Sequence, residues 1–147
     1  MPHIQDQQGN YLIRLDINTE IISELQKWAK QHGHSAGSFQ AIGALKEAEL
    51  GFYHLHEKTY EKKVFKDEME LISLHGNLSL VDGEPFVHIH VSLGDSEFKV
   101  WGGHLFSAKV AVTCEVFFRP FKTEGTIIRE FNEQIGLKHL CFIEKRR

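Results

Sequence analysis

The chain has 147 residues, a formal net charge of -3 at pH 7, and a composition that is 41% hydrophobic and 25% charged. These values are typical of one globular domain, so we predict a single domain over residues 1–147. They disfavour a protein that holds nucleic acid through its phosphates, because such proteins usually have a basic face. We interpret the short basic tail, residues 145–147, as a solvated end.

The sequence has no segment that would place the chain in a membrane. The first ten residues lack the apolar core of a signal peptide, and no apolar run approaches the ~20 residues that span a bilayer. Two cysteines, Cys114 and Cys141, are too few for a disulfide framework. We therefore expect a cytoplasmic protein without membrane partners. Cys114 stands in an apolar strand pattern and is predicted to be a core residue.

The first elements predicted along the chain are a strand and a helix. Residues 11–16 alternate apolar and polar side chains, which predicts a strand. Asn18-Thr19-Glu20 supplies a capping side chain and an acid for a helix start, and Gly33 suits the left-handed residue that follows a helix end. Apolar residues recur on one helical face between them, so we predict one main amphipathic helix at about residues 19–32.

The rest of the chain predicts strands without linkers or repeats. Residues 36–44 are rich in small side chains, which indicates either a strand with close backbone approaches or a strand that ends at Gly43. Within residues 68–80 the alternation places Met69 and His75 on one face. The other predicted strands are 46–54, 60–65, 87–93, 98–101 and 110–118, followed at 126–143 by two short strands around a turn or short helix.

This pattern predicts an α+β fold with a mostly antiparallel β-sheet, one main helix and short extra helical turns. The most apolar strand, 110–118, is expected at the centre of the sheet. The 11 phenylalanines leave room for an apolar subunit interface as well as a core. Motifs of nucleotide-binding loops, serine-nucleophile elbows and helical zinc sites are missing, so no nucleotide cofactor is expected.

Three histidines have the spacing of a metal site. His88 and His90 are one residue apart in a predicted strand, so their side chains share a face, with Cα atoms roughly 6.5–7 Å apart. His104 follows Gly102-Gly103 on the predicted return strand. If the turn is centred on Ser96, His104 lies opposite His88 on the same face. A two-residue loop would place it on the other face, unless the glycines form a bulge.

Three neutral imidazoles with an open fourth position are a well-attested zinc arrangement, and nickel, copper and iron ions also accept imidazole. The alternative is a set of half-buried strand histidines with hydrogen-bond partners and no metal. His54 and His56 repeat the spacing but not the rest of the pattern. Glu115 is a candidate to accept a hydrogen bond from a metal-bound imidazole, with an ion pair to a lysine as the equal alternative.

Several segments together resemble the plants-and-prokaryotes-conserved (PPC) domain, the domain that plant nuclear proteins join to a DNA-binding AT-hook. The resemblance covers nearly the whole chain. It rests on His32-Gly33, residues 36–53 (AGSFQAIGALKEAELGFY), residues 70–76 (ELISLHG), His88-Ile89-His90, Gly102-Gly103-His104-Leu105 and Thr113-Cys114-Glu115-Val116. The family often has alanine where this chain has Cys114.

The resemblance implies a stand-alone domain that assembles as a homotrimer, with His88, His90 and His104 as zinc ligands near a subunit interface. It also implies a provisional DNA-binding label, which this chain supports weakly because it has no Arg-Gly-Arg core of an AT-hook. Plant domains bind partners through a segment similar to Gly-Arg-Phe-Glu-Ile-Leu. The matching residues 67–72 read DEMELI, so plant-type partner binding is not expected.

Three functions follow as hypotheses. We favour a homotrimeric, DNA-associated regulatory protein with a three-histidine metal site that is not catalytic. The alternative is a metal-dependent enzyme that acts on an unknown small molecule through a water bound at the open metal position. In a third case the metal is structural and a fourth protein ligand closes the site.

Overall fold

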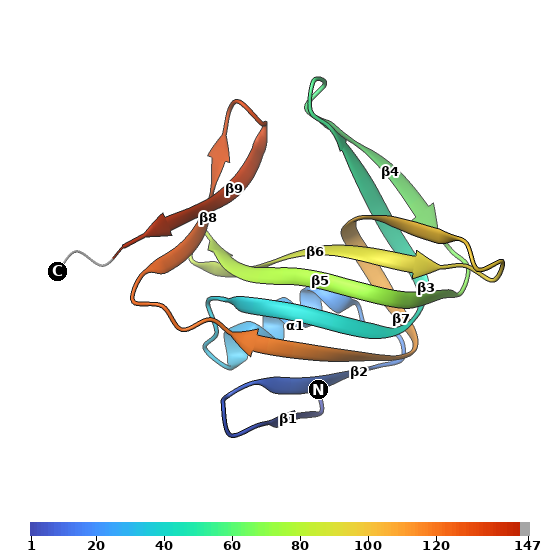
Figure 1. Ribbon diagram of the computed structural model, residues 1–147, viewed down its shortest axis with the longest axis horizontal. Coiled ribbons are helices and arrows are strands. Elements are labelled where there is room, and N and C mark those ends of the chain that lie inside the picture. Colours follow the sequence, from blue (N-terminus) through green and yellow to red (C-terminus); the bar gives the residue numbers. More distant parts are fainter. Residues whose placement is uncertain (145–147) are drawn as a thin grey trace.

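The computed structural model describes residues 1–144, which form a mostly β structure with a single helix (Figure 1). The basic tail 145–147 lies outside the described residues. No helix of the described part is long and apolar enough to cross a membrane. The elements are β1 (His3–Gln5), β2 (Tyr11–Asp16), α1 (Ile21–Gln31), β3 (Gly37–His54), β4 (Thr59–Phe65), β5 (Met69–Val81), β6 (Glu84–Gly94), β7 (Val100–Pro120), β8 (Thr126–Asn132) and β9 (Leu137–Ile143).

The strands form one sheet in the order β1-β2-β7-β3-β5-β8-β9, while β4 pairs with β3, and β6 pairs with both β5 and β7. Every described strand pair is antiparallel except β5 with β8, which meet in parallel at Leu80 and Ile128. The prediction of a mostly antiparallel sheet is therefore confirmed. The segment 110–118 lies at its centre, as expected, between β2 and β3.

Helix α1 begins and ends within the predicted range 19–32. Its cap is Glu20, whose carboxylate accepts hydrogen bonds from the backbone N–H groups of Ile22 and Ser23 at 3.2 and 2.8 Å. Gly33, just beyond its end, has the expected left-handed conformation with φ 69°. The helix buries its apolar face against the sheet through Ile21, Leu25, Trp28 and Ala29.

The expected short extra helical turns do not occur within residues 1–144. Near residues 132–135, where a turn and a short helix are the alternatives, β8 ends at Asn132 and residues 133–136 form the turn to β9. The Asn132 side chain organises this turn, since its oxygen accepts hydrogen bonds from the backbone N–H groups of Gln134 and Ile135. The structure is thus mainly β, with one helix on the sheet.

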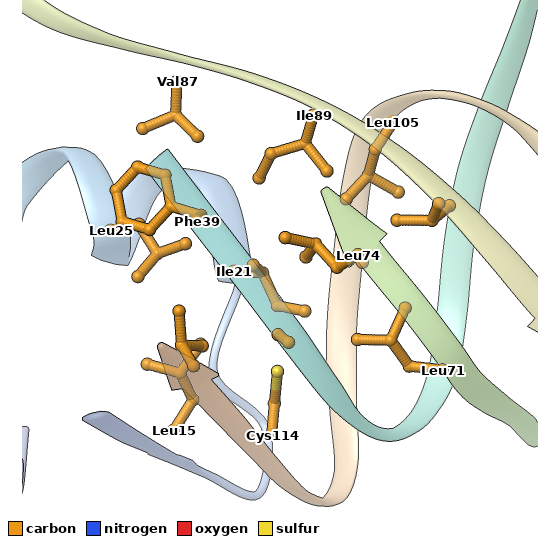
Figure 2. Close-up of a cluster of buried hydrophobic side chains, with 14 of the residues drawn as sticks. Leu15, Ile21, Leu25, Phe39, Leu71, Leu74, Val87, Ile89, Leu105 and Cys114 are labelled. Carbon is orange, nitrogen blue, oxygen red and sulfur yellow. The ribbon is translucent and has the colours of Figure 1, made fainter. Parts of the chain in front are cut away.

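One hydrophobic cluster lies between α1 and the sheet (Figure 2). Cys114 is fully buried in it, which confirms its prediction as a core residue. Burial raises the pKa of its thiol to about 12, so the reactive thiolate is disfavoured. The labelled members of the cluster are Leu15, Ile21, Leu25, Phe39, Leu71, Leu74, Val87, Ile89, Leu105 and Cys114.

Bulges explain where the predicted strands were wrong. The predicted segments 36–44 and 46–54 fall in β3, which begins at Gly37, because register shifts in the β3–β7 pairing absorb the changes of alternation. In the same way 110–118 and the end of 98–101 fall in β7, which begins at Val100, so residues 98 and 99 are loop and not strand. Gly43 does not end its strand: a Cβ there would lie 2.4 Å from the Thr113 carbonyl oxygen, so this is the close backbone approach. Another shift follows Leu71 in β5.

That shift reverses the faces of the second half of β5. Met69 and Leu71 are buried, but Leu74 is also buried and His75 is exposed, so the prediction that Met69 and His75 share a face is wrong. The β3–β4 and β8–β9 hairpins project away from the body of the sheet (Figure 1). Both hairpins matter for the histidines of β6 and β7, because each contributes a side chain beside them.

Candidate metal centre

His88 and His90 of β6 and His104 of β7 come together on one face of the β6–β7 pair. Their ring centroids lie 5.1 Å (His88–His90), 5.1 Å (His88–His104) and 5.4 Å (His90–His104) apart. One potential ligand atom from each ring lies within 4.8 Å of the others. The shared face expected from the His-x-His spacing is therefore correct, and the third ring joins it.

The register of the third histidine differs from the one that a turn centred on Ser96 would give. His104 pairs with His90, not with His88, and the β6–β7 pairing runs without a bulge to Gly94 and Val100. The loop has five residues, 95–99, and is centred on Glu97 instead of Ser96. Because the loop length is odd, His104 lies on the same face as His88 and His90. It pairs two positions further along β6 than a turn centred on Ser96 would give.

Asp95 fixes this loop. Its Oδ1 accepts hydrogen bonds from the backbone N–H groups of Glu97 and Lys99, both at 2.9 Å, and its Oδ2 accepts one from the Trp101 indole at 3.0 Å. These bonds lower the pKa of the Asp95 carboxyl, the Trp101 bond most strongly. The loop that sets the phase of His104 thus depends on one ionised side chain.

Glycines let neighbouring backbones approach the histidine strands closely. A Cβ on Gly76 of β5 would lie 2.5 Å from the carbonyl oxygen of His88. A Cβ on Gly103 would lie 2.8 Å from the carbonyl oxygen of Gly51, and a Cβ on Gly51 would lie 2.4 Å from the Phe106 ring. Larger residues at these positions would push strands away from the histidine cluster.

The three rings have different surroundings. His90 is exposed, while His88 and His104 are half-buried. Burial lowers the pKa of both half-buried rings to about 4. Arg129 and His90 contribute less at each ring, as do His104 at His88 and Lys62 at His104. His88 and His104 are therefore neutral at pH 7, and neutral imidazole is the form that binds metal.

His104 packs against two aromatic rings, Tyr60 of β4 at 5.3 Å and Phe106 at 4.7 Å between centroids. Its Nδ1 is buried and has no hydrogen-bond partner within residues 1–144. A buried ring nitrogen without a partner is costly, and a cation held together with the other two imidazoles would satisfy it. The residues present thus fit a metal ion with imidazole ligands.

Arg129 of β8 is the residue that sequence reasoning missed. Its Nη2 lies 3.1 Å from His88 Nδ1 and donates a hydrogen bond to Asn77 Oδ1 at 2.9 Å. Its Nε donates to the hydroxyl of the fully buried Ser79 at 3.0 Å. Only the pairing of β5 with β8 brings it there, and nothing in the local sequence signals that pairing.

Glu115 does not join the site. It is exposed on β7, level with Ile42 of β3, whereas His104 is level with Gly51. These two positions on β3 are nine residues apart, which is about 30 Å along a strand. Within residues 1–144 Glu115 forms no ion pair with a lysine either.

The second His-x-His pair also stays outside the cluster. His54 ends β3 and its Nε2 lies 3.0 Å from a carboxylate oxygen of Glu61 on β4. His56 is exposed in the turn that follows. This pair therefore gives an internal comparison, with the same spacing but no third histidine.

Comparison with known proteins places these residues in a family. The sequence pattern of the Plants and Prokaryotes Conserved (PCC) domain, the PPC domain of the resemblance above, matches residues 4–122. The chain belongs to this family. The match ends before β8, so Arg129 lies outside the matched residues.

Two solved structures of other proteins are similar over almost the full chain. One, from Bacteroides thetaiotaomicron, carries a provisional DNA-binding description and has 29% identity and a TM-score of 0.90, with 96% of each chain covered. The other, a protein of Archaeoglobus fulgidus described as metal-containing, has 38% identity and a TM-score of 0.85 over 96% of this chain and 99% of its own.

A relative of known description is the bifunctional protein GlmU of a Synechococcus strain, which is 33% identical over 96 residues. The match covers 65% of this chain but only 14% of the GlmU chain. This protein thus corresponds to a small part of that relative.

We predict that Gly76→Ala lowers the free energy of unfolding by about 1–3 kcal/mol, because the added methyl group meets the backbone behind His88. Chemical denaturation measures this change. Gly102→Ala is the matched control, since its nearest atom, the Val91 carbonyl oxygen, is 3.2 Å from the new carbon. Equal stability of the two variants would contradict the close approach of β5 to β6.

Proposed function

We propose that this protein is a homotrimeric, metal-binding PPC-domain protein in which His88, His90 and His104 hold a zinc ion. The observation that carries the proposal is the meeting of the three imidazoles within 4.8 Å, with a buried, unpartnered Nδ1 on His104. Nickel, copper and iron ions accept the same ligands and are competing occupants. The metal-containing relative with 38% identity supports a metal in this chain.

The cluster favours a site with an open position. It contains three histidines and no fourth histidine, cysteine or carboxylate within residues 1–144. Structural zinc sites are normally closed by four protein ligands, whereas three ligands leave room for water or a small molecule. A zinc ion there would polarise a bound ligand and lower the pKa of a bound water to about 7. The chain's own residues would hold the ion and keep two of the rings neutral.

For the wider role we propose association with DNA-linked regulation through partners, not through direct tight binding. The similar Bacteroides protein with its provisional DNA-binding description supports the association. The net charge of -3 argues against strong direct contact with phosphates. The free state of Cys114 and Cys141 agrees with a reducing compartment such as the cytoplasm.

The second candidate is a metal-dependent enzyme acting on a small molecule. The observation that favours it is the guanidinium of Arg129 beside His88, because a charged donor next to an open metal position is a common arrangement for binding a substrate. Glu115 lies too far along the sheet to act as a base in this reaction.

The homotrimer is supported by apolar side chains on the outer face of the sheet. Ile42, Ile72 and Phe117 line a shallow groove together with Gln40 and His75. The three apolar side chains are 54%, 49% and 54% exposed. An apolar patch of this kind on a sheet marks a contact surface, and we assign it to the neighbouring subunits.

We predict that His88→Ala combined with His90→Ala abolishes zinc binding, because two of the three ligands are lost. Elemental analysis of the purified, untagged protein measures it, with about one zinc per chain expected for the unmodified protein. The matched control is His54→Ala with His56→Ala, which changes the same residue types at the same spacing outside the cluster. Undiminished zinc in the first variant would refute the site.

We predict that Phe117→Glu converts the trimer to monomers, since a charge would have to be buried in the apolar subunit contact. Native mass measurement follows the change. The monomer should stay folded by circular dichroism, because Phe117 is half-exposed in the single chain. Ile4→Glu, at an exposed position on β1, should leave the trimer intact. A trimer that survives Phe117→Glu would exclude this face as the contact.

We predict that the isolated protein binds duplex DNA weakly, with a dissociation constant in the non-specific range of about 10⁻⁶–10⁻⁴ M or above, and without sequence preference. A gel-shift series at increasing salt, with unrelated duplexes as competitors, provides the measurement. Tight binding that resists salt and selects one sequence would contradict the indirect role.

A further inference from the structure

The guanidinium of Arg129 makes a set of contacts that reaches from a buried hydroxyl to the histidine cluster. Nε donates to Ser79 and Nη2 donates to Asn77, at 3.0 and 2.9 Å. Nη1 makes a longer contact of 3.5 Å with the carbonyl oxygen of Lys138. Nη2 also lies 3.1 Å from His88 Nδ1, and the guanidinium carbon lies 5.5 Å from the centre of the Phe86 ring. The side chain is thus anchored on β5 and β9 while one edge faces the cluster.

The contact with His88 fixes which ring nitrogen of His88 carries the proton. A guanidinium has five N–H donors and no acceptor, so Nδ1 of His88 must be the acceptor. A neutral imidazole has one acceptor nitrogen and one N–H. In this state the proton of His88 therefore lies on Nε2.

This arrangement and a metal on His88 exclude each other. A metal at Nδ1 would take the lone pair that Arg129 now uses. A metal at Nε2 would require the proton on Nδ1, where it would face a donor of Arg129 instead of an acceptor. In either case the bond between Arg129 and His88 is lost while the bonds of Arg129 to Ser79 and Asn77 remain available.

The charged side chains around the cluster indicate which kind of group Arg129 would bind once its contact with His88 is lost. The histidines supply no negative charge, and the charged side chains that act on His88 and His104 are Arg129 and Lys62, both cationic. Lys62 is compensated by an ion pair with Glu49 at 3.3 Å. Arg129 forms no ion pair within residues 1–144. A divalent ion would add further positive charge, so the loaded site lacks an anion.

We propose that Arg129 occupies the lone pair of His88 in the metal-free protein and, when a metal binds the histidines, becomes the anchor for a carboxylate ligand beside that metal. The proposal rests on the metal site proposed above and names the ligand class of that site. Without the His88 contact, two of the five donors of Arg129 are uncommitted. A carboxylate has two oxygens in one plane, so one can pair with the guanidinium while the other faces the cation.

The test uses Arg129→Gln, with Arg119→Gln at the exposed end of β7 as the matched control. Metal affinity is measured by competition between the purified protein and a chromogenic chelator for Co²⁺. Ligand binding is followed by the change in the visible cobalt spectrum on titration with acetate. Acetamide, which has a similar shape and no charge, is titrated in parallel.

We expect two opposite effects of Arg129→Gln. The variant should bind Co²⁺ about tenfold more tightly, because the competitor for His88 and its charge are gone, and bind acetate about tenfold more weakly, because a charge-assisted hydrogen bond is lost. Acetamide should bind weakly to all forms, and Arg119→Gln should behave as the unmodified protein. Arg129→Lys should keep acetate binding within about threefold, because it retains the charge. If Arg129→Gln fails to fold, Arg129→Met replaces it, because methionine also removes the charge and the N–H donors.

The outcomes separate this proposal from the proposed function. If the unmodified protein and Arg119→Gln bind no Co²⁺, the proposed metal site is refuted, and so is the proposed role of Arg129. If Co²⁺ binds but Arg129→Gln changes neither affinity, or if acetate and acetamide bind equally, the metal site stands and the carboxylate anchor is refuted.

Discussion

The antiparallel pairing of β3 with β7 is the constraint on which the rest of the structure depends. It runs from Gly37 opposite Pro120 to Gly51 opposite His104, so one strand pairing, with register shifts along it, joins the core to the histidine cluster. Near its middle, Gly43 admits the backbone of β7 at Thr113 beside the buried Cys114. At its end, Gly51 makes room for the Phe106 ring that packs on His104. The position of the third ring is therefore set by the same pairing that closes the core.

The chemistry of the cluster follows from unequal burial on a shared surface. Two rings are half-buried and neutral, and the third is exposed to solvent. Aromatic packing restrains His104 from the side of β4, while Arg129 holds His88 from the side of β8. The two hairpins that project from the sheet thus restrain two different histidines: the β3–β4 hairpin restrains His104 and the β8–β9 hairpin restrains His88. Burial lowers the cost of keeping the rings neutral, so that they are ready to act as ligands.

Much of this arrangement could be predicted from the sequence, where local periodicity decides the outcome. The strand period of two placed His88 and His90 on one face, and helix α1 was recognisable from its apolar stripe and from Gly33. The alternation of side chains predicted the wrong face wherever a β-bulge interrupts a strand. The shift after Leu71 reverses the second half of β5, and a bulge cannot be located from alternation alone. The two-residue error in the position of His104 arose because Asp95, through its own hydrogen bonds, decides the loop geometry.

Arg129 marks the limit of such reasoning, because its role depends on a single parallel contact between β5 and β8. The same contact has a consequence for the architecture. The histidines lie on strands within the residues that define the family, whereas the guanidinium arrives on an appended hairpin joined to the sheet at Leu80 and Ile128. The three histidines and the guanidinium thus come from two different parts of the chain, one inside and one outside the residues that match the family. With the proposed carboxylate anchor, exchanging the hairpin would change what the site recognises while the strands that carry the histidines stayed as they are.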